Sequence, residues 1–126
     1  LNNPGQAAYG FLMYDGEKLL YKQNERIGIA SNNVAEYTGL IKALEYVRDQ
    51  IQNSKSKIQS ISVFADSLLM VNQVKGVYKV KNADMKPLHS RVKMLEMEIG
   101  MAIKYTHVLR DKNAEADALV KEALGK

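Results

Sequence analysis

The pattern of hydrophobic and polar positions predicts a chain in which strands alternate with helices. The apolar stretch 7–14 precedes Asp15-Gly16, a dipeptide favoured in tight hairpins, and residues 18–30 provide a partner strand. Apolar residues then recur at intervals of three and four over 33–52, which predicts an amphipathic helix. The first half of the chain is therefore expected to form a β-hairpin followed by a long helix.

The second half continues with a strand over 58–65 that ends at Asp66. The pattern then predicts helices over 67–74 and about 84–99 (with Pro87 in the first turn), a strand over 102–109, a loop RDKN, and a closing helix over 113–124. Strands separated by helices favour parallel neighbours, so the fold class is α/β with an antiparallel hairpin at one side. Residues 1–126 are long enough for one domain with one core.

Composition and charge narrow the function classes. The chain is 46% hydrophobic and 25% charged, and none of its apolar runs has the length of a membrane span, so we expect no membrane partner. It has no cysteine, which excludes disulfides and thiolate metal sites and fits a cytoplasmic location. The net charge is +4, and six basic residues against one acid lie between Lys75 and Lys93. This basic segment is compatible with binding to nucleic acid. The alternative is that these charges simply form a solvent-exposed loop and helix face.

Three carboxylates stand in unusual positions: Glu36, Asp66 and Asp117. Glu36 is placed either to close a capping box with Asn33 as N-cap or to lie on the flank of the buried stripe. Asp66 either caps the following helix or contributes to a ligand site at the carboxyl end of a strand. Asp117 lies on a mostly apolar side of the last helix, where a partly buried acid needs a partner.

Taken together, these acids predict a cluster of oxygen ligands without cysteine and with little histidine nearby. Such a cluster suits magnesium or manganese, because a divalent cation relieves the repulsion between neighbouring carboxylates. With a basic segment beside it, the cluster indicates phosphate chemistry.

Four ordered motifs resemble type 1 ribonuclease H over nearly the whole chain. The family has an N-P-G-x-x-x-Y-G turn, a T-N-N-x-A-E-Y-x-G-L-I-x-x-L helix start, a D-S-x-L-V-x-x-Q-x-x-G-x-W-K-V-K segment and an H-V-P-R-x-x-N-x-x-A-D-x-L-A ending. The matching segments here are NNPGQAAYGF (2–11), SNNVAEYTGLIKAL (31–44), FADSLLMVNQVKGVYKVKN (64–82) and HVLRDKNAEADALVKEAL (107–124).

The resemblance implies a three-layer fold with a five-stranded mixed sheet and helices on both faces. It implies cleavage of the RNA strand of RNA–DNA hybrids with two Mg²⁺ ions, for which Mn²⁺ can substitute, in a protein expected to be monomeric. Glu36, Asp66 and Asp117 fall on three of the four family metal ligands. Arg110 falls in the loop that lies near the departing phosphate.

The resemblance also implies substrate contacts. Residues expected to bind the hybrid are Asn3, Asn32, Asn33, Ser67, Tyr78, Lys79 and Lys81. The asparagines would reach 2′-hydroxyls and base edges in a wide minor groove, and the lysines would meet phosphates of the DNA strand. Leu68 stands where many members have a glutamine, which removes one polar contact, and the long basic protrusion of some bacterial members is absent.

The start of the chain departs from the family pattern. In the family the first turn follows a strand whose aspartate is the fourth metal ligand, and this sequence begins one residue after that point. We therefore expect the sheet to lack its first strand and the 126 residues alone to show weakened or no cleavage. The alternative hypothesis is an RNase H-like domain that binds hybrid without cutting it.

Overall fold

The computed structural model describes residues 4–53 and 57–125. Asn3, one of the expected substrate contacts, lies outside the described residues. The elements follow in the predicted order: β1 (Gly5–Asp15), β2 (Lys18–Ala30), α1 (Asn32–Asn53), β3 (Ile61–Ala65), α2 (Leu68–Val74), α3 (Lys86–Ile99), β4 (Ile103–His107), the 3-10 helix η1 (Arg110–Asn113) and α4 (Ala114–Ala123).

The hairpin forms where the sequence places it. β1 and β2 pair antiparallel from Gly5 opposite Ala30 to Asp15 opposite Lys18. Gly16 supplies the turn with a φ of 60°, a conformation that costs glycine little. The alternation of the pleat then directs Tyr9 toward one face of the hairpin and Gly10 toward the other.

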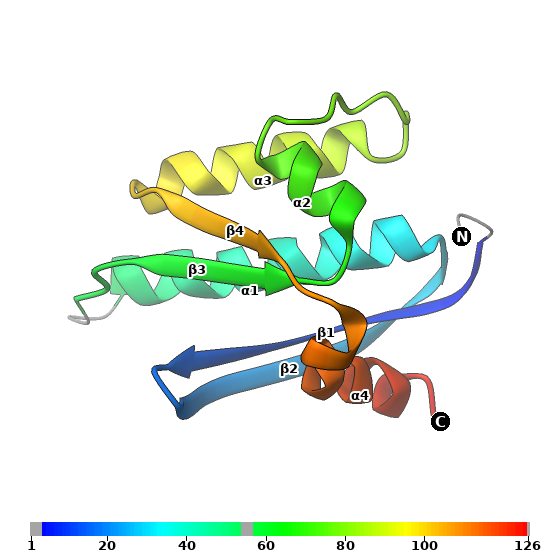
Figure 1. Ribbon diagram of the computed structural model, residues 1–126, viewed down its shortest axis with the longest axis horizontal. Helices are drawn as coiled ribbons and strands as arrows, with labels where there is room; N and C mark the ends of the chain where they lie inside the picture. Colours follow the sequence, from blue (N-terminus) through cyan, green and yellow to red (C-terminus); the bar gives the residue numbers. More distant parts are fainter. Residues whose placement is uncertain (1–3, 54–56, 126) are drawn as a thin grey trace.

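The second strand pair is parallel, as the intervening helices require. β3 and β4 pair in register from Ile61 opposite Ile103 to Ala65 opposite His107, and the Val108 N–H donates to the Ala65 carbonyl just beyond. The described strands thus form two two-stranded sheets, β1–β2 and β3–β4. Across Figure 1 the four strands follow one another in the order β4, β3, β1, β2.

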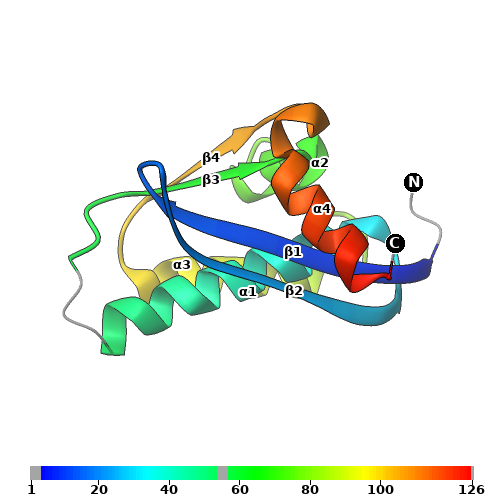
Figure 2. The same cartoon turned by 90° about the horizontal axis from the view of Figure 1, so that it is seen from below.

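Helices cover both faces of the strands, which confirms the three-layer prediction. Figure 2 shows α1 and α3 on one side of the hairpin and α4 on the other. On the α1 side, Gly39 lies against the Tyr9 side chain, whereas Leu119 of α4 lies against Gly10. The architecture is therefore α/β with mixed strand directions.

The main core lies between α1, α2, α3 and the β3–β4 pair. Its most completely buried members are Tyr37, Leu44, Val71, Val74, Val92 and Leu95. The polar side chain of Gln73 is buried with them, and it accepts a hydrogen bond from the Tyr37 hydroxyl at 2.6 Å. No helix of the described residues is long and apolar enough to cross a membrane.

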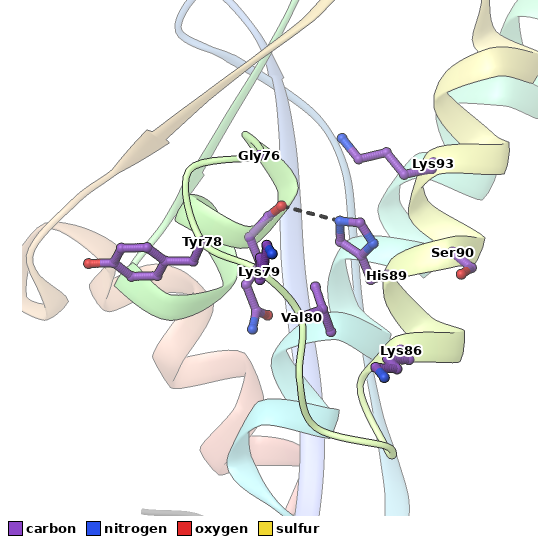
Figure 3. Close-up of a pocket in the computed structure, with 9 residues that line it drawn as sticks. Gly76, Tyr78, Lys79, Val80, Lys86, His89, Ser90 and Lys93 are labelled. Atoms are coloured by element: carbon purple, nitrogen blue, oxygen red, sulfur yellow. Dashed lines mark hydrogen bonds between the residues drawn. The ribbon is translucent and has the colours of Figure 1, made fainter.

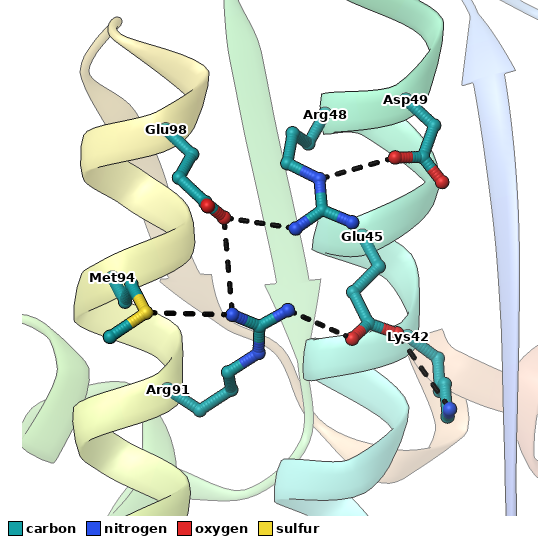
Figure 4. A network of polar contacts seen from close by, with 7 residues as sticks. All are labelled: Lys42, Glu45, Arg48, Asp49, Arg91, Met94 and Glu98. Atoms are coloured by element: carbon teal, nitrogen blue, oxygen red, sulfur yellow. Dashed lines mark hydrogen bonds and ion pairs between the residues drawn. The ribbon is translucent and has the colours of Figure 1, made fainter.

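Ion pairs join α1 and α3 at the surface of this core (Figure 4). Arg48 of α1 contacts Glu98 of α3 at 2.9 Å, and Arg91 of α3 contacts Glu45 of α1 at 3.2 Å. Each arginine pairs with the opposite helix, and Arg91 also lies 3.9 Å from Glu98. Such a connected set fixes the alignment of α1 on α3 better than an isolated exposed pair would.

Two local predictions are wrong. The segment RDKN, expected as a loop, forms the 3-10 helix η1, with the Lys112 N–H donating to the Leu109 carbonyl. Asn33 is not the N-cap of α1, because the helix begins at Asn32 and the Val34 N–H donates to the Ser31 hydroxyl at 3.2 Å. A serine in the position before the helix satisfies a free N–H of the first turn as well as asparagine does.

Candidate functional site

Asp66 stands at the carboxyl end of β3 and is not needed as a helix cap. The cap of α2 is Ser67, whose hydroxyl accepts a hydrogen bond from the Met70 N–H at 3.2 Å. Only 9% of the Asp66 side chain is exposed. Of the two interpretations open at this position, the ligand-site interpretation is therefore the one that the structure favours.

Glu36 lies near the start of α1 and is partly buried. With Ser31 as the cap, a capping-box role with Asn33 no longer accounts for Glu36. The Glu36 side chain thus has no local structural task in the helix start, although its removal from water is costly for a charged group.

Glu36 lies within electrostatic range of the other two carboxylates. Burial is the largest cause that raises the pKa of Glu36 to about 7, and the negative charges of Asp66 and Asp117 raise it further. The Arg110 guanidinium acts in the opposite direction and lowers the pKa of Glu36. Four residues from α1, the end of β3, η1 and α4 therefore lie within electrostatic range of one another around Glu36: Glu36 itself, Asp66, Arg110 and Asp117.

Two of these carboxylates already have a positive partner. Arg110 Nε lies 3.5 Å from Asp66 Oδ2, and 78% of the Arg110 side chain is exposed. Lys121 Nζ lies 3.2 Å from Asp117 Oδ2, one helical turn away on α4. Lys121 is the partner that a partly buried acid at position 117 requires, and Asp117 lies in the first turn of α4, where the helix dipole also favours a negative charge.

Within residues 4–53 and 57–125, no three Asp, Glu, His or Cys side chains lie close enough together to hold a metal ion. Asp66 and Asp117 thus lie near enough to raise the pKa of Glu36 without the three acids forming a closed ligand set. The metal site expected at Glu36, Asp66 and Asp117 stays a prediction.

The remaining expected contacts fall into two groups. Asn32 and Asn33 begin α1 on the same helix end as Glu36, and Ser67 is occupied as the cap of α2. Tyr78 and Lys79 are exposed in the loop after α2, at the end of that helix remote from Asp66, and Lys81 is exposed a little further along the same loop. The structure therefore separates an acidic region from a basic one.

A cavity of about 460 Å³ lies in the basic region, between the loop and α3 (Figure 3). Its lining residues are Gln73, Gly76, Tyr78, Lys79, Val80, Lys86, His89, Ser90 and Lys93. His89 and Ser90 are not among the residues expected from the sequence to bind substrate. The signal was available, because positions 86, 89, 90 and 93 share one face of a helix.

Comparison with known proteins supports the resemblance. A family model described as reverse transcriptase-like matches residues 1–123. The crystal structure of LC11-RNase H1 in complex with an RNA/DNA hybrid is 38% identical and superposes with a TM-score of 0.90, covering 98% of this chain and 88% of that one. The chain belongs to the ribonuclease H1 family.

Two further relatives of this ribonuclease H1 domain support the same family assignment. Ribonuclease HI of Halobacterium salinarum is 36% identical over 97% of the chain and 58% of its own length, and the crystal structure of RNase H1 from that organism superposes with a TM-score of 0.86. A bifunctional protein of Mycobacterium tuberculosis is also 36% identical over 97% of the chain, which corresponds to 32% of the mycobacterial protein. The chain spans about a third to somewhat over half the length of these curated relatives.

Proposed function

We propose that this ribonuclease H1 domain cleaves the RNA strand of RNA–DNA hybrids by metal-assisted hydrolysis of phosphodiester bonds. The observation that carries the proposal is the electrostatic coupling of Glu36 to Asp66 and Asp117 at the end of β3. The similarity to LC11-RNase H1, which was crystallised with an RNA/DNA hybrid, supports hybrid as the substrate class. A monomeric, cytoplasmic enzyme is part of the same proposal.

The donor set fits divalent metal ions. Glu36, Asp66 and Asp117 offer only carboxylate oxygens, the ligands that Mg²⁺ prefers, and Mn²⁺ accepts the same set. The raised pKa of Glu36 reflects a burial and crowding of negative charge that a cation would relieve. When bound, two such ions supply Lewis-acid activation of water and neutralise charge at the scissile phosphate.

The side chains of the site have separate tasks in this proposal. Glu36 must lose its proton before it can serve as a ligand, so its pKa of about 7 makes metal binding stronger as the pH rises through neutrality. Lys121 holds the carboxylate of Asp117 from the next turn of α4.

Arg110 is the candidate for a contact with the departing phosphate. Its guanidinium is largely exposed and lies 3.5 Å from Asp66, so it is placed to donate to a phosphate oxygen beside that carboxylate. A planar guanidinium suits a bidentate contact with the phosphate that carries the new charge after cleavage.

Substrate recognition is assigned to the start of α1 and to the two ends of α2. Asn32 and Asn33, next to Glu36, are proposed to contact 2′-hydroxyls and base edges of the hybrid's minor groove. Tyr78, Lys79 and Lys81 are proposed to contact the DNA strand, the lysines through its phosphates. The Ser67 hydroxyl already accepts the Met70 N–H as the cap of α2. It is therefore proposed to contact substrate only through the hydrogen bonds that this hydroxyl can still form.

The test is cleavage by the full polypeptide that carries this domain. A labelled RNA–DNA hybrid should be cut in its RNA strand with Mg²⁺ and not with a chelator, whereas duplex DNA should remain intact. Asp66→Asn should lower kcat by at least about 10³-fold, the scale of losing an essential electrostatic group at a reaction centre. Asp111→Asn, on the exposed part of η1, is the matched control and should leave kcat unchanged.

Absence of Mg²⁺-dependent cleavage in the full polypeptide would refute the proposal. Hybrid binding without cleavage would then favour the hypothesis of a domain that holds hybrids without cutting them.

A further inference from the structure

A hydrogen bond joins the hairpin to α4 outside the carboxylate site. The Asn24 side chain, in the middle of β2, is half-buried and donates from Nδ2 to the Leu119 carbonyl oxygen at 2.7 Å. Leu119 lies two residues beyond Asp117 on the same helix. This bond therefore links the hairpin directly to the helix that carries one of the three carboxylates.

The residue opposite Asn24 makes this bond possible. Asn24 pairs with Gly10 across the hairpin, so the two positions share the face on which α4 lies. A Cβ at Gly10 would lie 2.7 Å from the Cβ of Leu119 and 3.1 Å from the Ala116 carbonyl oxygen. Because glycine has no Cβ, the backbone of α4 approaches β1 closely enough for the short Asn24 side chain to reach it. One strand supplies the space, and the other supplies the donor.

The apolar and polar contacts of α4 constrain it in different ways. The Leu119 side chain is buried, which is favourable but non-directional, so apolar packing alone lets a helix shift along the surface beneath it. A hydrogen bond requires a short distance and a narrow range of angles, so it fixes where its acceptor lies along the strand. Asp117 is rigidly joined to that acceptor by roughly half a turn of helix. Fixing the Leu119 carbonyl therefore fixes Asp117 as well.

A second polar contact holds α4 on the other side of Asp117. The Tyr14 hydroxyl donates to Glu115 Oε2 at 2.6 Å, two residues before Asp117, and this contact is exposed. Figure 2 shows α4 lying over the hairpin that provides both donors. The bond from Asn24 is the more sheltered of the two, and a hydrogen bond is stronger where water is partly excluded. Asn24 is thus the main polar anchor of α4.

We propose that Asn24 is a positioning residue for the metal site, and that its bond to Leu119 sets the place of Asp117 in that site. The inference rests on the proposed function. In the part of the chain that the structure describes, the three acids do not form a closed ligand set, so a small displacement of α4 decides whether Asp117 can complete it. Metal ligands must be held within about 0.5 Å of their productive positions. Loss of the Asn24 bond should therefore act first on metal affinity.

Mn²⁺ binding to the full polypeptide tests this role without substrate, through the decrease in the EPR signal of the free ion. Asn24→Leu keeps the size of the side chain and removes the donor. It should raise the Kd for Mn²⁺ roughly 10-fold, at the lower end of the loss expected when a group that orients a metal ligand is removed. Asp117→Asn measures the Mn²⁺ that binds elsewhere. In cleavage assays the half-maximal Mg²⁺ concentration should rise by the same factor, whereas kcat at saturating Mg²⁺ should change less.

Gln23→Leu is the matched control. Gln23 directly precedes Asn24 on β2 and points to the opposite face, where its Nε2 donates to the Tyr9 hydroxyl at 2.6 Å. This variant loses a comparable half-buried amide hydrogen bond that does not involve α4, and Tyr9 keeps its bond to Glu25. It should lower the free energy of unfolding about as much as Asn24→Leu does, while its Kd for Mn²⁺ stays close to that of the unmodified protein.

The remaining outcomes separate the positioning role from the proposed function. Equal losses of Mn²⁺ affinity in Asn24→Leu and Gln23→Leu, or unchanged or tighter binding in Asn24→Leu, would overturn the role of Asn24. If Asn24→Leu does not fold, Asn24→Ser replaces it with the same expected result, because the serine hydroxyl is too short to reach the Leu119 carbonyl. Weakened Mn²⁺ binding in the Asn24 variant, with no Mg²⁺-dependent cleavage by the unmodified polypeptide, would refute the proposed hydrolysis and leave the positioning role standing.

Discussion

The hydroxyl of Tyr37 donates a hydrogen bond to Gln73 Oε1 across 2.6 Å in the core. Tyr37 directly follows Glu36 on α1, and Gln73 lies on the helix that begins after Asp66. The bond therefore ties together the two elements that carry two of the acidic side chains. Burial raises the pKa of Tyr37 to about 12, so the hydroxyl keeps its proton across the working pH range.

Tyr37→Phe should destabilise the domain by about 1–3 kcal/mol, because the buried oxygen of Gln73 loses its donor. Urea unfolding measures the change in the free energy of unfolding. Tyr14→Phe is the control, since the Tyr14 hydroxyl donates to Glu115 at the exposed surface, and its effect should stay within about 0.5 kcal/mol. Equal losses of unfolding free energy in the two variants would show that the buried hydrogen bond contributes no more to stability than the exposed one.

Gly10→Ala should disturb the contact between β1 and α4. A Cβ at Gly10 would lie 2.7 Å from the Cβ of Leu119, closer than two carbon atoms can approach. Relief requires α4, which carries Asp117, to move away, and overpacking of this kind costs about 1–3 kcal/mol. Unfolding and hybrid-cleavage assays should both show a loss.

Gly5→Ala is the matched control for that substitution, because a Cβ there meets nothing within 4 Å. It should change the free energy of unfolding by less than about 0.5 kcal/mol. A well-folded Gly10→Ala variant with full activity would contradict the importance of the close approach between β1 and α4.

Glu36 should make the metal-free domain less stable as the pH rises. Its pKa is raised from 4.5 to about 7 in the folded protein, so folding favours the protonated form. The stabilisation is fully present below pH 4.5 and is lost as the pH rises to 7, by at most about 3 kcal/mol for a shift of this size.

Urea unfolding in a chelator at pH 4 and pH 8 measures this loss. Glu36→Gln cannot ionise and should therefore be more stable than the unmodified protein at pH 8, with a much smaller difference at pH 4. Glu17→Gln, in the exposed turn of the hairpin, should follow the unmodified protein at both values. If the unfolding free energies of Glu36→Gln and the unmodified protein changed in parallel with pH, the raised pKa of Glu36 would be refuted.

Much of the fold follows from local sequence patterns. Asp15-Gly16 predicts the hairpin, the apolar spacing over 33–52 predicts α1, and the alternation before Asp66 predicts the strand that ends there. These signals are local because strand and helix periodicities depend on which face of one element is buried. The family resemblance likewise rests on ordered motifs in the sequence.

The roles of individual polar residues required the folded chain. Asn33 and Ser31 are both acceptable caps by residue type, as are Asp66 and Ser67. In the folded chain the serine hydroxyls accept the first-turn N–H groups, from Val34 and Met70. That selection left Asp66 and Glu36 without capping roles.

By itself, then, the sequence determined the order of the elements, the α/β class, and the three acids and the basic segment from which a site could be built. The tertiary structure alone decided that Arg110 pairs with Asp66, that Glu36 is affected by two other carboxylates, and that His89 and Ser90 join three lysines around a cavity. The physical reason is the distance over which each interaction acts. Periodicity and capping preference act over a few neighbouring residues, whereas charge coupling and cavity lining depend on distances between elements that only packing brings together.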